Sequence, residues 1–261
     1  MSRYARELET AVMAARRAAA IYHNCESETE TKGNEMGAYD IVTDNDIKAE
    51  RSILSTISDA FPDDSFLCEE SGEDIRSDRV WTVDPIDGTV NYARGLNAYG
   101  TQIALMEGDE TIVSAIYVPY DDLMICAEKG CGTTVNGRRV DIKERRPMDE
   151  CILSINDYTK RSKEFRRMHI DLVNVLCEKV GRMRMYGCAC YDFAMLATGG
   201  IDYHTRFLHH PWDHVPGMLI CTEAGAIFDE DLFRKRELLM LARSEENLSE
   251  IVNAVDDGMS W

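Results

Sequence analysis

Hydrophobic residues recur at helical spacing in several parts of the chain. Near the start, Leu8, Val12, Ala15, Ala19 and Tyr22 follow one another at steps of three or four residues, which predicts an amphipathic helix. Similar periodicity predicts helices over residues 44–60, 164–180, 190–198, 212–224 and 245–255. Residues 26–37 are polar and contain glycine, so they predict a loop.

Short runs rich in valine, isoleucine, leucine and threonine predict strands. They cover residues 65–68, 80–83, 101–106, 112–118 and 123–128, and the glycines at 130, 132 and 137 indicate turns of a meander. Later strands at 154–156, 183–186 and 238–242 alternate with helices. This order predicts an α/β protein with two sheets. We expect an N-terminal lobe, residues 1–145, and a C-terminal lobe, residues 146–261, joined in one catalytic unit.

The charge balance narrows the classes of partner. The 261 residues include 29 Lys and Arg against 47 Asp and Glu, which gives a formal net charge of −18. This excess of negative charge argues against nucleic acid, whose phosphates need cationic side chains, and against a polybasic membrane surface. It does not exclude a small anionic substrate, because a bound cation can reverse the local charge.

The cysteines and the N-terminal residues indicate the cellular compartment in which we expect the protein. No stretch of about 18 apolar residues predicts a transmembrane helix, and arginine and glutamate are spread through the first 20 residues, unlike a signal peptide. The nine cysteines are an odd number without a C-x-x-C pair. We therefore expect reduced thiols and a cytoplasmic protein. The spacing of the histidines at 209, 210 and 214 from Cys188 and Cys190 fits no compact zinc module.

Acidic residues gather at the ends of predicted elements, at positions 40–46, 69–70, 84–87 and 213. Taken one at a time, these groups have ordinary interpretations: Asp46 and Asp213 as helix caps, Glu69 and Glu70 as solvated charges, and residues 84–87 as a turn. Taken together, they supply the carboxylate oxygens that Mg²⁺ prefers. Asp84 and Asp87 could share two ions about 3.5–4 Å apart, as in two-metal hydrolytic sites.

Several sequence motifs resemble those of a known family. Residues 81–92, WTVDPIDGTVNY, resemble the first signature of the inositol monophosphatase family, and residues 211–217, PWDHVPG, followed by TEAG at 222–225, resemble the second. Residues 40–46 and 69–71 match two shorter family motifs in the expected order, and residues 129–137 match a further stretch. Four motifs in order over nearly the whole chain are more specific than any one of them.

The resemblance implies a layered α-β-α-β-α sandwich, usually a homodimer, that uses Mg²⁺. By similarity, Glu69, Asp84 and the backbone carbonyl of Ile86 hold a first ion. A second, more weakly bound ion is held by Asp84, Asp87 and Asp213. A third ion, which binds together with the substrate, contacts Glu69.

The resemblance also implies catalytic and substrate-binding residues. Thr89 and Asp46 would orient and deprotonate the attacking water, with Thr43 supporting Asp46 from the same helix start. Gly88 and Thr89 would open a helix whose amides receive phosphate, in keeping with the chemistry of helix N-termini. A small-residue turn formed by residues 187–189 (Gly187, Cys188 and Ala189) would contact the substrate.

Two positions depart from the family pattern. Arg206 lies six residues before Trp212, in a segment (202–210) that we interpret as a loop, where inositol-specific relatives carry a glutamate that grips sugar hydroxyls. An arginine there suits a second anionic group, although it could also point to solvent or pair with Asp202. Cys188 replaces a common serine or threonine and could be a small packing residue.

The sequence therefore predicts Mg²⁺-dependent hydrolysis of a small phosphate monoester, with inositol 1-phosphate as the first candidate. Fructose 1,6-bisphosphate, histidinol phosphate and a 3′(2′),5′-bisphosphate nucleotide are alternatives within the family. A catalytically idle, protein-binding regulator is a more distant alternative from another class.

Overall fold

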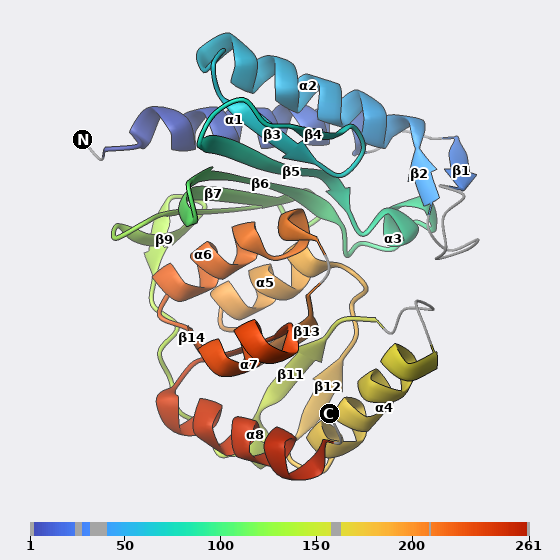
Figure 1. Cartoon of the computed structure of the whole chain (residues 1–261), viewed down its shortest axis with the longest axis vertical. Helices are drawn as coiled ribbons and strands as arrows, with labels where there is room; N and C mark the ends of the chain where they lie inside the picture. The colour runs from blue at the N-terminus through green and yellow to red at the C-terminus, as the bar shows by residue number, and fades with distance from the viewer. Residues whose placement is uncertain (1–2, 24–27, 32–40, 158–162, 209, 260–261) are drawn as a thin grey trace.

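Helices and sheets alternate in five layers (Figure 1). The computed structural model describes residues 3–23, 28–31, 41–157, 163–208 and 210–259. The first layer is α1 (Ala5–Tyr22) with α2 (Asp44–Ala60), which contact each other and the sheet beneath them. The α-β-α-β-α arrangement that the resemblance implied is confirmed.

The second layer is an eight-stranded sheet in the order β10-β9-β8-β7-β6-β5-β3-β4. Its strands are β3 (Ser65–Cys68), β4 (Gly72–Asp74), β5 (Arg79–Asp87), β6 (Gly100–Glu107), β7 (Glu110–Val118), β8 (Leu123–Glu128), β9 (Gly132–Val135) and β10 (Arg138–Val140). All neighbours pair antiparallel except β3 and β5, which are parallel. The meander predicted for 101–128 is therefore present. A separate small ladder joins β1 (Thr29–Thr31) and β2 (Ile41–Thr43).

The middle layer consists of α5 (Ala189–Ala197) and α6 (Val215–Glu223), which lie between the two sheets (Figure 1). Ile116 and Ile125 of the first sheet, Phe193 of α5, Ile220 of α6 and Leu239 of the second sheet belong to one buried cluster. The short helix α3 (Thr89–Ala93) follows β5. Helices that come after residue 145 therefore pack against a sheet that comes before it, so the two predicted lobes share a core.

The remaining layers are a five-stranded sheet and its outer helices. The sheet has the order β12-β11-β13-β15-β14, with β11 (Ile152–Ile155), β12 (Arg182–Arg184), β13 (Tyr203–Phe207), β14 (Ile227–Phe228) and β15 (Leu238–Ala242). Helices α4 (Lys163–Cys177) and α8 (Glu245–Gly258) contact each other and contribute to its buried cluster, and α7 (Glu230–Arg236) lies against β15. The described residues also include the short 3₁₀ turns η2 (Met148–Glu150) and η3 (Pro211–Asp213).

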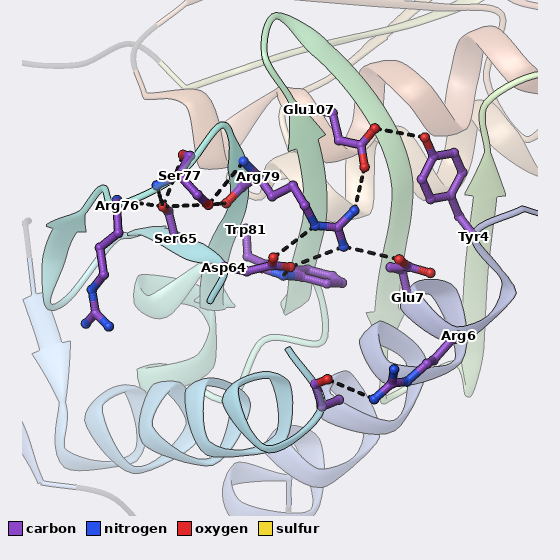
Figure 2. A network of polar contacts seen from close by, with 11 residues as sticks. Tyr4, Arg6, Glu7, Asp64, Ser65, Arg76, Ser77, Arg79, Trp81 and Glu107 are labelled. Carbon is purple, nitrogen blue, oxygen red and sulfur yellow. Dashed lines mark hydrogen bonds and ion pairs between the residues drawn. The ribbon is translucent and has the colours of Figure 1, made fainter. Parts of the chain in front are cut away.

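An arginine-centred network fastens the first helix to the first sheet (Figure 2). The Arg79 guanidinium on β5 donates to Asp64 at 2.9 Å, to Glu7 of α1 at 3.1 Å and to Glu107 of β6 at 2.5 Å. The Tyr4 hydroxyl donates to Glu107 at 2.8 Å. Because carboxylates from three other segments converge on one planar donor group, the network fixes the orientation of α1 over the strands.

Two sequence interpretations need correction. Residues 202–210 were expected to form a loop, but Tyr203–Phe207 is the central strand β13, buried along its whole length. Its three middle residues, His204, Thr205 and Arg206, are polar and form hydrogen bonds inside the protein, so the strand lacks the apolar signal that strand prediction uses. The loop expected at 26–37 contains strand β1, and its other residues, apart from Glu28, lie outside the described residues, as do Asp40 and His209.

Other differences concern the ends of elements. The helix predicted over 164–180 ends at Cys177, and the one predicted over 212–224 is a 3₁₀ turn followed by α6. Among the described residues, no helix combines the length and the apolar character needed to cross a membrane.

Candidate active site

A β-bulge brings Asp84 and Asp87 to one face of β5. Three residues of separation would place them on opposite faces of a regular strand. Asp84 lies opposite Gln102 and Asp87 opposite Gly100, so three steps along β5 match two steps along β6. The extra residue, at positions 85–86, turns both carboxylates toward the same side.

Two further carboxylates reach this side, one from the turn after the neighbouring strand β3 and one from η3. Carboxylate oxygens of Asp84, Asp87 and Asp213, the last from η3, lie within 4.8 Å of one another. Glu69 follows β3 directly, and its amide donates to the carbonyl of Val83 at 3.1 Å. The four carboxylates that the sequence analysis assigned to metal are therefore neighbours in the structure.

The electrostatics of this cluster are those of a cation site. Burial raises the pKa of Asp84 well above its ordinary value, and the charges of Glu69, Asp87 and Asp213 raise it further. The Oδ1 atom of Asp84 is buried and has no hydrogen-bond partner among the described residues. A cation that binds oxygen would offset the repulsion between these carboxylates and give the buried Asp84 oxygen a partner. The residues present therefore fit Mg²⁺.

Asp87 has protein partners as well. Its Oδ2 accepts hydrogen bonds from Gln102 Nε2 at 2.9 Å and from the backbone amide of Cys190. Burial and Asp213 raise the pKa of Asp87 to about 6, although the Cys190 amide and Arg206 act in the opposite direction. The carboxylate is therefore held in a fixed orientation while it keeps a tendency to bind a proton or a cation.

Thr43, Asp46 and Thr89 form a second group beside the carboxylates. Asp46 Oδ2 accepts from the Thr43 amide at 2.8 Å and from the Thr43 hydroxyl at 2.5 Å, which closes the capping box of α2. The Thr89 hydroxyl lies 3.4 Å from Asp46 Oδ1 and donates to the Ile86 carbonyl at 3.0 Å. Thr43 is thus the N-cap of α2 and Asp46 the third residue of its capping box, as the ordinary interpretation holds, and Asp46 is also the neighbour of Thr89.

Glycines allow two turns to approach each other closely, on the side of the site where we expect the phosphate to bind. Gly88 has a φ of 84°, and a Cβ there would lie 2.9 Å from the Ala98 carbonyl oxygen and 3.0 Å from Cys188 Cβ. Asn91 of α3 donates to the Tyr186 carbonyl at 2.7 Å, which ties α3 to the turn at residues 187–189. The residues predicted to contact substrate, Gly88, Thr89, Gly187, Cys188 and Ala189, therefore come from two adjoining turns.

Arg206 projects toward Asp213. Its Nη1 donates to the backbone carbonyl of Asp213 at 2.8 Å, and its Nη2 lies 3.4 Å from the Asp213 carboxylate. Neither of the alternatives considered for it, solvent or Asp202, is right: the residue is 6% exposed, and Asp202 pairs with Arg243 at 3.1 Å. The guanidinium therefore adds a fixed positive charge behind a carboxylate of the cluster.

Two supporting residues escaped the sequence analysis. Glu50 of α2 is 3% exposed, and its carboxylate accepts from the backbone amides of Glu70 at 2.9 Å and Ser71 at 3.0 Å, which fixes the turn that carries Glu69. Gln102 holds Asp87 from β6. The available signal was a polar residue at a predicted core position: Glu50 lies one turn after Asp46, and Gln102 interrupts an apolar strand.

Comparison with known proteins places the chain in a family. A profile of the Inositol monophosphatase family matches residues 4–250. The chain belongs to this family. It is 33% identical over 195 residues to the fructose-1,6-bisphosphatase/inositol-1-monophosphatase of Aquifex aeolicus, a match that covers 74% of each chain. It is 32% identical over 226 residues to Nus factor SuhB of Escherichia coli strain K12, covering 85% of this chain and 84% of that one.

A solved structure agrees with the fold of this family member. The extragenic suppressor protein SuhB from Bartonella henselae matches with a TM-score of 0.88 at 27% identity, over 98% of this chain and 100% of that chain. Family membership indicates a phosphatase. The names of the relatives differ in substrate and in role, so they leave the specific reaction to be argued from the site.

Proposed function

We propose that this inositol monophosphatase family member hydrolyses a small phosphate monoester in a Mg²⁺-dependent reaction, with inositol 1-phosphate as the first candidate substrate. The observation that carries the proposal is the convergence of four carboxylates, one of them with a buried, unpartnered oxygen. A cluster so negative would repel a phosphate on its own, and it suits a phosphate ester once it holds cations.

The proposed ligands divide between two main ions. Glu69, Asp84 and the carbonyl of Ile86 would hold the first, and Asp84, Asp87 and Asp213 the second, while Glu69 would also support a third. When bound, Mg²⁺ lowers the pKa of water and neutralises charge that develops on the phosphate. Gln102 and the Cys190 amide keep Asp87 oriented for this purpose.

Asp46 is proposed as the proton acceptor. Thr43 occupies its Oδ2 with two hydrogen bonds, so Oδ1, which faces the Thr89 hydroxyl at 3.4 Å, is the atom placed to receive the proton from the attacking water. Thr89 would orient that water. The backbone amides of Gly88 and Thr89, together with the turn of residues 187–189, would contact the phosphate and its leaving group.

A substrate panel with controlled metal tests this proposal. We expect hydrolysis of inositol 1-phosphate with millimolar Mg²⁺, loss of activity in EDTA and recovery when Mg²⁺ is added back, because every proposed side-chain ligand is a carboxylate. The panel should include fructose 1,6-bisphosphate, histidinol phosphate and a 3′(2′),5′-bisphosphate nucleotide. Full turnover in chelated buffer would rule out the metal mechanism. A folded protein that hydrolyses none of them would favour the alternative of a catalytically idle, protein-binding regulator.

Mg²⁺ should stabilise the fold more at pH 8 than at pH 5. Without metal, Asp87 has a pKa of about 6 when folded, against about 4 when unfolded, so ionising it as the pH rises through this window destabilises the folded state. A cation compensates ionised carboxylates only. At ten times its Kd, Mg²⁺ contributes about 1.4 kcal/mol, or roughly 3–5 °C in Tm. Thermal unfolding with and without Mg²⁺ measures this, and equal shifts at both pH values would contradict it.

Arg206 is proposed to favour substrates with a second anionic group. With saturating Mg²⁺, Arg206→Gln should lower kcat/KM for inositol 1-phosphate somewhat, because Asp213 loses its partner, and should lower that for fructose 1,6-bisphosphate by about one to two further decades, the value of one charge-assisted contact. Gln is chosen because a glutamate would bury a like charge against Asp213. Equal losses of kcat/KM on both substrates would instead mean that the guanidinium only positions Asp213 and does not contact the substrate.

A further inference from the structure

Two cysteines adjoin the carboxylate cluster, and the proposed phosphatase mechanism uses neither thiol. Cys188 caps the N-terminus of α5, and Cys190 lies in its first turn, so both side chains come from one short C-x-C segment. Their Sγ atoms are 3.4 Å apart. Cys188 Sγ also lies 3.5 Å from Asp87 Oδ2, and ligand atoms of all three residues fall within 4.8 Å of one another.

These separations match the edges of a coordination tetrahedron. With Zn–S near 2.3 Å and Zn–O near 2.1 Å, two sulfur ligands of one ion stand about 3.8 Å apart, and a sulfur and an oxygen about 3.6 Å apart. The observed 3.4 Å and 3.5 Å are within a few tenths of an ångström of these values. An ion could therefore be held here with small changes in these separations, once Asp87 Oδ2 gives up one of the hydrogen bonds that it accepts from Gln102 and the Cys190 amide.

The chemistry of the ligands also differs from that of the magnesium cluster. Thiolates are soft ligands that select zinc, cadmium or copper(I), whereas Mg²⁺ takes oxygen. Once the incoming ion has displaced their protons, two thiolates and one carboxylate would carry enough negative charge to compensate a divalent ion. Three protein ligands leave the fourth tetrahedral position open, which is the arrangement of an exchangeable ion and not of a closed structural zinc site.

We propose that Asp87, Cys188 and Cys190 form a binding site for a thiophilic divalent cation, and that zinc is the ion it binds in the cell. Asp87 is common to this site and to the proposed second Mg²⁺ site. A zinc ion held by the thiolates would also bind the Asp87 carboxylate, which is a proposed ligand of the second Mg²⁺. Zinc bound at this site would therefore inhibit the enzyme. Binding itself does not depend on the proposed function, but the inhibition rests on it.

The contacts of the site suggest the order of entry. Asp87 is 8% exposed and Cys188 is 4% exposed, whereas Cys190 is fully buried. An ion that arrives from the carboxylate cluster would meet Asp87 and Cys188 first and reach Cys190 last. Behind Cys190 the site is closed by Gly100, where an added Cβ would lie 2.8 Å from the Cys190 sulfur.

Cadmium titration of the full chain, reduced and freed of metal, tests binding without reference to activity. We expect ultraviolet absorption from thiolate-to-cadmium charge transfer that saturates at one ion per chain. Loss of even an outer partner of a metal ligand weakens binding 10–100-fold, so Cys188→Ser and Cys190→Ala should each weaken it by about 100-fold or more. Cys221→Ala is the matched control, because Cys221 is buried in α6 and its sulfur contacts only the Phe193 carbonyl among the hydrogen bonds of the described residues.

A second arm measures inhibition. With Mg²⁺ saturating, zinc should inhibit the wild type and the Cys221→Ala control at similar concentrations, and Cys190→Ala should need about 100-fold more, each compared with its own zinc-free rate. Cadmium absorption unchanged in both cysteine variants would overturn the site. Normal absorption with no zinc inhibition of an active enzyme would overturn its regulatory role and leave the phosphatase assignment intact. Normal absorption in a protein without phosphatase activity would instead contradict the proposed function.

Discussion

Replacing Asp84 with asparagine is expected to lower kcat on the preferred phosphate ester by about 10³-fold or more. Asp84 is the proposed ligand common to both main Mg²⁺ ions, and its Oδ1 is the buried oxygen that lacks a partner. A bound ion contributes several kcal/mol of transition-state stabilisation, and about 4 kcal/mol corresponds to a factor of about 10³. Asparagine keeps the size of the side chain but halves its oxygen ligands and removes its charge.

Steady-state kinetics over a range of Mg²⁺ concentrations measures the effect. The Mg²⁺ dependence of Tm should disappear in the same variant, while the metal-free protein should be as stable as the wild type or more so, because burial of this charge is unfavourable. Asp109→Asn, an exposed carboxylate at the β6–β7 turn, serves as the control and should change neither quantity. Activity of Asp84→Asn within tenfold of wild type would contradict the shared-ligand arrangement.

Asp46→Asn should lower kcat by about 10²–10⁴-fold without loss of Mg²⁺ or phosphate binding, because the proposed proton acceptor becomes an amide. An asparagine oxygen can still accept from Thr43, so the capping box of α2 should survive in part. Kinetics at saturating Mg²⁺ together with phosphate binding to the variant separate chemistry from binding.

The matched control for Asp46→Asn is another aspartate that caps a helix. Asp229 accepts from the Leu232 amide at 2.8 Å at the start of α7. Asp229→Asn should cost a similar amount of stability and leave kcat unchanged. If Asp46→Asn also kept wild-type kcat, Asp46 would have only the capping role that its position at α2 allows.

Sequence reasoning was most successful where chemistry and periodicity agreed. Helix α2 was predicted with its observed bounds, since a threonine cap, an acidic third residue and an apolar stripe all point to residues 44–60. The carboxylates of the candidate site were found because they stand at strand ends in recognisable motifs. Their convergence required the resemblance, because the spacing of Asp84 and Asp87 alone does not reveal a bulge.

The failures have a common physical cause. Strand β13 is buried along its whole length, yet its three middle residues are polar. His204 bonds to Ser154 and Thr205 to the Leu239 carbonyl, and both partners are distant in sequence. The Ser154–His204 contact at 2.8 Å joins two strands that no local window compares, and the Arg206–Asp213 contact joins β13 to η3, which no periodicity connects. Arg206 was therefore assigned to a loop. Glu50 and Gln102 were missed for the same reason, because each acts through a backbone or side chain from another segment.

The division of the carboxylates between the two halves of the chain has a consequence during synthesis. Asp213 follows Asp87 by 126 residues, and the middle helices that bring it into place also come late. At 5–20 residues per second, the ribosome needs roughly 6–25 seconds to supply it after Asp87 has been made. During that interval the nascent N-terminal half displays Glu69, Asp84 and Asp87 without their fourth partner. The proposed four-carboxylate site can therefore be complete only late in synthesis, and metal binding by all four carboxylates would report that both halves have come together.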